Sequence, residues 1–463
     1  MATRFVLIDR ETPLLLPPDL RDWVPAGHLV HLVLDAVATL DLRQVKVNER
    51  GTGSEQYPPP MMLALLIYSY ATGTFSSRRI EQSTYDSVPV RLLTADTHPD
   101  HDTICSFRRE NRALLSESFV KVLQLAQQVN VLQFGQITVA VDGTKVLAHA
   151  SKHSAVSYER AGEMIAQLEL EVQQLLAKAE QADATPLQDG LTIPDEITRR
   201  QERKAALAQA RAEIEARAHV RYTAQLAEHE QKLAERAAKK KRGEKVGGQP
   251  PKPPTPAPEP GDQYNFTDPE SRIMKAGNGN HFEQSYNAQA AVEVESRLIV
   301  GERVSHAPND KQELVPTLAA IPTAAGTVTA ALVDSGFFSA AAVQQIEEAE
   351  AGPTVYAAME KTGHHRSVAD LEKRPDPESP TADASIAEVM RHRLRTTAGK
   401  ALYKLRQQTV EPVFGIIKAV LGFRQFRLRG RAKVSLEWTL VCLAYNLERL
   451  HRLGAGLKLA ATN

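Results

Sequence analysis

The sequence is poor in cysteine, which limits the ways in which it can be stabilised. Among its 463 residues it has two cysteines, Cys105 and Cys442, far apart in the chain and without the spacing of metal ligands. Neither a disulfide framework nor a thiolate zinc site is therefore supported. A chain of this length is long enough for two or three domains, so we expect its stability to come from a large apolar core.

Long apolar runs are also missing. No segment approaches the ~20 consecutive apolar residues that a membrane-spanning helix needs. The first 20 residues carry acids and prolines where a secretion signal would need an uninterrupted apolar core. We therefore expect a cytoplasmic protein that makes no use of a membrane.

The chain has no excess of charge of either sign, yet its charges are unevenly distributed. It has 56 basic and 56 acidic residues, which taken alone argues against a nucleic-acid partner. Between Arg391 and Lys433, however, twelve lysines and arginines stand against one acid, Glu411. A local field of this kind suits a polyanion. The alternative is a basic face exposed to solvent.

Residues 1–130 read as a mostly helical N-terminal domain. Apolar residues recur at helical spacing in "VPAGHLVHLVLDAVATL", in "MMLALLIYSYATG" and again before residue 128. A small helical module of this kind commonly holds DNA, and Arg78 and Arg79 are candidate phosphate contacts. The alternative is a dimerisation or packing module, and the sequence does not choose between the two.

Residues 155–262 read as an insertion between strand-like segments. Two segments, 157–182 and 196–242, are rich in good helix formers. The first places Ile165, Leu168, Val172 and Leu175 three and four residues apart, which is the seam of a coiled-coil-like hairpin. Seven prolines between Pro250 and Pro260 then predict an extended, semi-rigid tether.

Two carboxylates follow apolar, strand-like runs. Asp142 comes after "QITVAV" and directly precedes Gly143, while Asp334 comes after "TVTAALV" and precedes Gly336 by two residues. We expect each strand to end at its acid. A lone Asp-Gly pair usually opens a turn, whereas a buried carboxylate requires a cation, a metal or hydrogen bonds to compensate it.

Glu411 adds a third acid, on a helical segment. Carboxylates at the tips of two adjacent strands and on a helix across them can hold two hard divalent cations, which prefer oxygen ligands. Two such cations activate a water or a DNA 3′-hydroxyl and stabilise the leaving oxygen of a phosphoryl transfer. This chemistry accounts for acids that would otherwise be unfavourable at these positions.

After the strand that leads to Asp142, we expect two strands, a helix, the strand that leads to Asp334, a helix, a strand and the helix of Glu411. This order of elements resembles that of DDE transposases of bacterial insertion sequences. Three strings carry the resemblance: "DGTKVLAHASKHSAVSY", "VDSGFFS" and "YKLRQQTVEPVFGIIK". The resemblance implies an α/β fold with a ribonuclease-H-like mixed-sheet catalytic core, an α-helical N-terminal domain and the helical insertion. The core would comprise residues 131–154 and 263–463, with basic C-terminal helices.

The resemblance also implies roles for individual residues. Asp142, Asp334 and Glu411 would be the catalytic metal ligands for two Mg²⁺ or Mn²⁺ ions. The partner would be double-stranded DNA, as element ends and as target, held by a homodimer or higher oligomer. The candidate DNA contacts of the C-terminal region are Tyr403, Arg406, Lys418, Arg424, Arg427 and Arg429. The implied activity is cleavage at the inverted repeats and strand transfer. The alternatives are a metal-dependent nuclease without strand transfer and a non-catalytic DNA-binding relic.

One departure from the related pattern concerns Arg406. Four residues separate it from Glu411, where better-known branches have three. On an unbroken helix a five-residue step leaves the two side chains about 140° apart. Pro412 disfavours a continuous helix here, and Thr409 is a candidate cap for a new one. Seven residues after Glu411, Lys418 should share its helix face and contact the DNA backbone.

Two further groups of residues have a functional and a structural interpretation. Four histidines lie in polar, turn-like stretches: His281, His306, His364 and His365. A structural metal site is the less favoured of their two interpretations. Phe423 and Phe426 alternate with arginines, so they either stack on bases or belong to the core.

Overall fold

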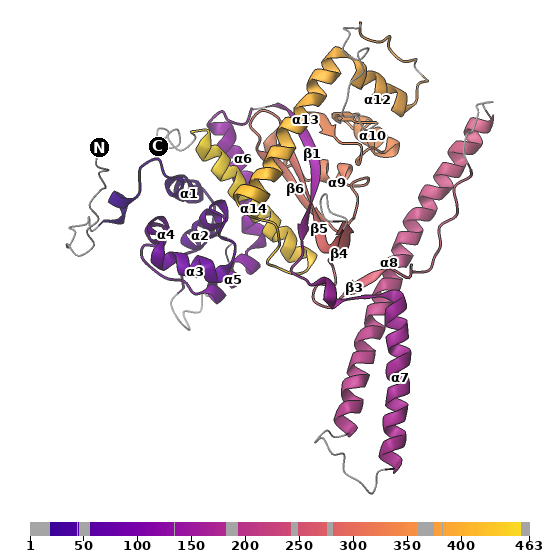
Figure 1. The fold of residues 1–463 in the computed structure, drawn as a ribbon. Helices are drawn as coiled ribbons and strands as arrows, with labels where there is room; N and C mark the ends of the chain where they lie inside the picture. The colour runs from indigo at the N-terminus through magenta and orange to yellow at the C-terminus, as the bar shows by residue number, and fades with distance from the viewer. Residues whose placement is uncertain are drawn as a thin grey trace, which may run out of the picture. The chain divides into compact units, whose positions relative to one another are not determined.

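The computed structural model describes the chain in two compact units (Figure 1). One unit comprises Met1–Val146 and Asn287–Asn463, and the other comprises Leu147–Tyr286. The residues described are 19–43, 45, 56–133, 135–181, 193–241, 249–275, 281–359, 375–381 and 383–454.

The first unit begins with the helical region that the apolar spacing predicts. α2 (Pro59–Ala71) is the most apolar of these helices, and its residues from Met62 to Ala71 are all buried. The others are η1 (Leu20–Trp23), α1 (Leu29–Ala38), α3 (Ser77–Asp86), α4 (Val88–Leu93), α5 (His101–Glu110) and α6 (Arg112–Gln128). Over the described ranges, no helix combines the length and the apolarity that crossing a membrane requires.

The C-terminal helix α14 (Arg431–Arg452) joins these helices to the sheet. It packs against α1, α2 and α6 and also against the strand β6 (Ile299–Ser305). A buried polar chain crosses this contact: Arg108 donates to the Tyr70 hydroxyl (2.8 Å), which donates to Glu437 of α14 (3.1 Å). The N-terminal helices and the sheet therefore share one core.

Among the described residues, the main sheet has six strands in a mixed arrangement. The order is β4-β5-β1-β7-β8, with β6 paired to β5. β1 pairs in parallel with β7, and β7 with β8, while β5 is antiparallel to β4 and β6. The bounds are β1 (Gln136–Leu147), β4 (Arg272–Lys275), β5 (Phe282–Glu293), β7 (Thr327–Val333) and β8 (Thr354–Ala357). This mixed α/β arrangement is compatible with the predicted ribonuclease-H-like core.

The helices of this region follow the predicted order. α9 (Leu314–Ala319) lies in the chain between β6 and β7, and α10 (Ala340–Glu347) lies between β7 and β8. The strand pair β5–β6 turns through Glu295 and Ser296, as predicted. α12 (Ile386–Arg395) was not predicted; a capping box between Ser385 and Glu388 begins it.

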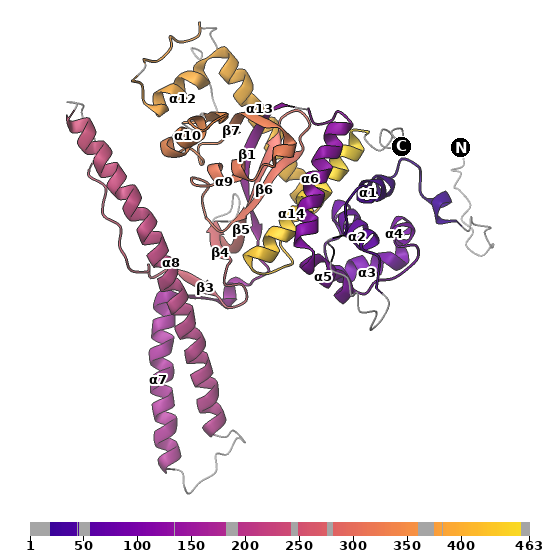
Figure 2. The ribbon, with the colours of Figure 1, turned by 180° about the vertical axis from the view of Figure 1, so that it is seen from behind.

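The second unit contains the predicted hairpin of two long helices (Figures 1 and 2). α7 (Tyr158–Gln181) packs on the first half of α8 (Ile193–Lys241). Ile165 and Leu168 of the predicted seam pack against a buried cluster that includes Leu207 and Ile214 of α8. We call the segment 155–262, with these helices and the tether, the arm.

The arm returns along α8 and closes on a short strand pair. In the tether, the carbonyl of Pro251 lies 3.3 Å from His229 Nε2 of α8, and Asp262 forms a two-bond ion pair with Arg221 (2.8 and 2.9 Å). β2 (Ala155–Ser157) and β3 (Gln263–Asn265) then pair antiparallel. The Tyr158 N–H also donates to the Asp262 carbonyl (2.8 Å), so the two ends of the arm are hydrogen-bonded to each other.

Candidate active site

Asp142 lies within a strand rather than at its end, so the prediction that the strand ends there was wrong. β1 is almost entirely buried up to Val141 and then continues, half-buried, through Asp142 as far as Leu147. The Asp-Gly pair opens no turn, because Gly143 extends the same strand. The Gly143 N–H donates to Asp142 Oδ1 (2.8 Å) and fixes one carboxylate oxygen.

Asp334 follows the last residue of β7, as predicted. The parallel register pairs Ala140 with Leu332. Continued by two residues, this register places Asp142, within β1, beside Asp334, directly after β7. Asp334 Oδ1 accepts a hydrogen bond from the Gly336 N–H (2.8 Å), so each acid is held by a glycine that follows it.

The electrostatics at Asp142 are those of a carboxylate that needs a cation. Burial raises the pKa of Asp142 to about 7, and the neighbouring Asp334 acts in the same direction. Arg406 opposes both effects but does not cancel them. In the metal-free chain this carboxyl therefore gains and loses its proton near neutral pH.

Arg406 and Tyr403 reach the acid pair from α13 (Thr397–Gly415). Arg406 Nη1 lies 3.4 Å from Asp142 Oδ2, and both side chains are mostly buried. The Tyr403 hydroxyl donates to the Val333 carbonyl (3.0 Å), the residue before Asp334. These two residues of the helix motif are thus placed at the acids. Their predicted contact with DNA stays a prediction.

Glu411 is not brought to the acid pair. α13 continues through Pro412, and Thr409 Oγ1 donates to the Leu405 carbonyl (2.7 Å) inside the helix, so the predicted break and new cap were wrong. With Arg406 directed at Asp142, the helical step directs Glu411 about 140° away, and its side chain is exposed. Within the described ranges, no group of three His, Cys, Asp or Glu residues is arranged to hold a metal ion.

Lys418 takes a position that the sequence did not predict. It lies in a π-helical turn (Ile416–Val420) that follows α13, so the simple α-helical count from Glu411 does not apply. Its Nζ donates to the Lys145 carbonyl of β1 (2.7 Å). Burial lowers the pKa of Lys418, and the charges of Arg424 and Lys145 lower it further.

A polar cluster lies on the other face of β1 and was missed by the sequence reasoning. Asp310 Oδ1 accepts hydrogen bonds from the Asn287 and Gln289 amides (2.6 and 2.7 Å), and Lys145 Nζ lies 3.9 Å away. A Cβ on Gly143 would lie 2.6 Å from Asp310 Oδ1 and 2.4 Å from Gln289 Nε2, so a side chain at this position would displace these polar groups. The available signal was a pair of amides, Asn287 and Gln289, at alternate positions of the strand-like segment before Ala290.

The remaining predicted residues divide between surface and core. Arg78 and Arg79 of α3 are exposed, as are Arg424, Arg427 and Arg429. Phe423 and Phe426 are fully buried, so the core interpretation is correct and base stacking by them is not. Neither His281 nor His306 belongs to a metal-ligating group of described residues, and His364 and His365 lie outside those residues.

Two family models match the chain. The model described as "Transposase DDE domain" matches residues 377–451, which include α13 and α14. The model described as "Transposase domain (DUF772)" matches residues 18–110, the N-terminal helices. Both support a DDE-type transposase of an insertion element. No curated protein and no solved structure gives a significant match.

The two transposase matches bear on different parts of the first unit. The DDE-domain match contains Tyr403, Arg406, Glu411 and Lys418 but neither aspartate of the sheet. The DUF772 match contains Arg78 and Arg79. The transposase assignment thus rests on both ends of the chain, whereas the pairing of Asp142 with Asp334 is a finding of the structure.

Proposed function

We propose that this transposase binds the terminal inverted repeats of its own element, cleaves DNA at the element ends and transfers the freed 3′-hydroxyls to target DNA. The observation that carries the proposal is the pair Asp142 and Asp334 on adjacent parallel strands. The transposase DDE-domain match over the neighbouring α13 supports it.

The residues at the site suit a divalent cation in part. Asp142 and Asp334 supply the hard oxygen ligands that Mg²⁺ or Mn²⁺ prefers, and the raised pKa of Asp142 reflects a buried carboxylate that is incompletely compensated. Glu411 would supply the third ligand only after a change in α13, because it points elsewhere in this structure. When bound, a pair of such ions would activate the nucleophile and stabilise the leaving oxygen.

The chain's own side chains have distinct proposed tasks around the acids. Arg406 keeps Asp142 compensated in the metal-free state, at a distance of 3.4 Å. Tyr403 fixes α13 on β7 through the Val333 carbonyl. The exposed arginines Arg424, Arg427 and Arg429 follow the buried Phe423 and Phe426 in alternation, so they present charge to the DNA backbone.

The proposed partners follow from the reaction. Joining an element end to a target requires double-stranded DNA at both positions, and pairing two ends requires a homodimer or higher oligomer on DNA. Arg78 and Arg79, on the exposed side of α3, would contact phosphates of the end. The proposed place of action is the cytoplasm, on the DNA.

Two alternatives predict different products. A nuclease with the same fold would cut end DNA without joining it, and a relic would bind DNA without cutting it. The largely buried Asp142 favours catalysis over the relic, because a buried carboxylate that is incompletely compensated lowers the stability of a metal-free fold.

A cleavage and joining assay tests the proposal. The substrate is a duplex that carries the inverted repeat read from the DNA flanking the gene, incubated with Mg²⁺ and a target plasmid. Asp142→Asn and Asp334→Asn should abolish cleavage and joining but retain folding and DNA binding, because they remove a charged ligand and keep the shape. Asp35→Asn, an exposed acid of α1, is the control and should act like the wild type.

The products decide between the alternatives. Joined products that depend on both aspartates support the transposase, and cut but unjoined ends support the nuclease. Binding without any cleavage by the wild type supports the relic. Full activity of either variant would remove that aspartate from the site.

A further inference from the structure

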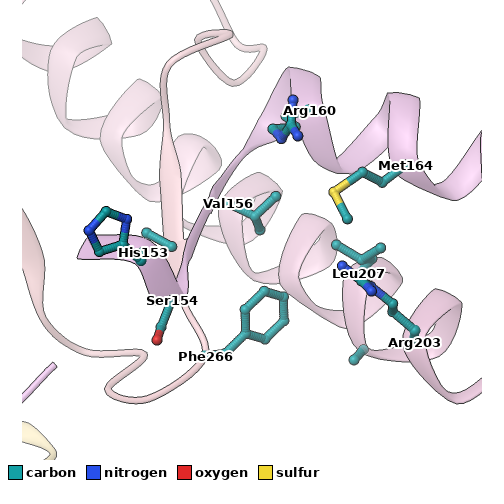
Figure 3. Close-up of a pocket in the computed structure, with 10 residues that line it drawn as sticks. His153, Ser154, Val156, Arg160, Met164, Arg203, Leu207 and Phe266 are labelled. Carbon is teal, nitrogen blue, oxygen red and sulfur yellow. The ribbon is translucent and has the colours of Figure 1, made fainter. Parts of the chain in front are cut away.

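The second unit contains a pocket of about 440 Å³ at the base of its helical hairpin (Figure 3). It is lined by one end of α7, by α8, by Ala155 and Val156 of β2 and by residues next to β2 and β3. In Figure 3, Phe266 and Val156 lie on one side of the pocket. Leu207 and Arg203 of α8 lie on the other side, together with Met164 of α7. All of these residues belong to the second unit.

The pocket combines an apolar floor with an aromatic ring that is held in place. Val156 and Leu207 are buried members of the cluster between α7 and α8. Phe266 is 45% exposed, although large aromatic side chains are usually covered. Its backbone N–H donates to the Ser154 carbonyl (2.9 Å), and its ring packs edge-on against Tyr264 at 5.4 Å. The exposed ring is therefore a fixed surface.

Two arginines of the pocket differ from their neighbours. Along the same helices, Arg200 pairs with Glu171 (2.9 Å) and Arg221 pairs with Asp262 (2.8 Å). Arg160 and Arg203 line the pocket. Neither is in a close ion pair with a described carboxylate, although the charge of Arg203 lowers the pKa of Glu171. A guanidinium whose donors are not taken up by a close carboxylate, next to an exposed ring, is suited to bind phosphate.

We propose that this pocket binds one unstacked nucleotide of a DNA strand. The base would lie on Phe266 against the apolar floor, and the adjoining phosphate would lie between Arg160 and Arg203. The pocket has the size of small-molecule sites in proteins, and stacking on an aromatic ring tolerates any base. The DNA source of the nucleotide rests on the proposed function, whereas the nucleotide chemistry rests on the pocket alone.

Binding of a short fluorescein-labelled oligodeoxythymidylate to the full chain, followed by anisotropy in EDTA, tests the proposal. Phe266→Leu should weaken binding about tenfold, as expected for one lost base-stacking contact. Phe282→Leu is the matched control, because Phe282 is also exposed, at 54%, but lies outside the pocket. Arg203→Gln should lower the salt slope of log affinity by about 0.7, the value for one phosphate on a single strand, while Arg199→Gln, which removes a paired arginine of α8, should not.

The outcomes separate this proposal from the proposed function. Equal affinities of wild type, Phe266→Leu and Arg203→Gln would overturn the pocket proposal, as would equal losses in the control variants. Competition by free thymidine monophosphate as tight as that by the oligonucleotide would overturn the DNA source. The assay needs no cleavage, so a wild type that neither cuts nor joins DNA would leave a Phe266-dependent affinity intact.

Discussion

Arg406 and Asp142 are 264 residues apart in the chain, and their side chains meet at 3.4 Å. The arginine thus lies where a cation would approach the acid pair. We predict that Arg406→Gln strengthens the binding of Mn²⁺ to the DNA-free chain, because the competing positive charge is gone. Electron paramagnetic resonance titration at pH 8.5, above the wild-type Asp142 pKa of about 7, measures it. Lys404→Gln, an exposed change on the same helix, should leave the affinity unaltered, and weaker binding in Arg406→Gln would contradict the prediction.

Glu411→Gln should have little effect on the free chain but should abolish the reaction with DNA. Because the Glu411 side chain is exposed in the free chain, the substitution should change stability by less than ~0.5 kcal/mol. It should also leave Mn²⁺ affinity without DNA at the wild-type value while abolishing cleavage. Thermal melting, the Mn²⁺ titration and the cleavage assay measure the three quantities. A loss of Mn²⁺ affinity as large as that of Asp142→Asn would show that Glu411 already binds the metal in the free chain.

Lys418→Ala should affect both the fold and DNA binding. Its Nζ donates to the Lys145 carbonyl, and loss of a hydrogen bond from a charged donor costs about 1–3 kcal/mol. An ammonium has two further donors, so a phosphate contact remains predicted, with a decrease in salt slope of up to about one unit on duplex DNA. Chemical denaturation and binding isotherms at several salt concentrations measure both. Lys433→Ala, an exposed change on α14, is the control; unchanged stability would argue against the bond to β1.

Glu302→Gln should remove a pH dependence of stability. Burial raises the pKa of Glu302 to about 7. Its Oε1 accepts from Thr439 (2.6 Å), and its Oε2 has no hydrogen-bond partner among the described residues. Between pH ~4.5 and about 7 the folded chain holds a proton that the unfolded chain has lost, so the free energy of unfolding falls as pH rises through this window. Glu302→Gln should raise the melting temperature at pH 8 but hardly at pH 4.5. A melting temperature that depends on pH in the same way in the wild type and in the variant would refute this.

Replacement of 155–262 by a Gly-Ser linker should leave the first unit folded. The buried cluster of the arm lies within the second unit, and β2 pairs only with β3 in the described sheets. Circular dichroism and thermal melting of the shortened chain measure folding, and light scattering with end DNA measures pairing. An aggregated product would show that the arm is part of the core, and retained pairing of DNA ends would show that it is dispensable for synapsis.

The elements predicted well from the sequence are those that local chemistry determines. Helix formers at nearly every position predicted α7 and α8, and β-branched runs predicted β1 and β7. The extension of β1 beyond Asp142 was missed, because Asp142 and Gly143 disfavour a strand locally. Pairing within the sheet overrides that preference.

The directions of the side chains within the site were harder to predict from the sequence. The sequence gives the five-residue step from Arg406 to Glu411, but the rotation of α13 about its axis depends on packing against β7. The contacts of Asp310 also depend on tertiary packing, because its partners Asn287 and Gln289 lie on β5. The division of the chain into four domains and the roles of the site residues stay predictions.

The two connections of the arm have a mechanical consequence. Leu147 ends β1 and begins the second unit five residues after Asp142, and Asn287, where the first unit resumes, holds Asp310. Any load on the arm has two covalent routes into the rest of the chain, and these are β1 and β5. Tension along one strand acts on the residue that carries the first acid, and tension along the other acts on the cluster behind it. Both covalent connections of the arm therefore run through strands that carry polar groups of the first unit, which are Asp142 on β1 and Asn287 and Gln289 on β5.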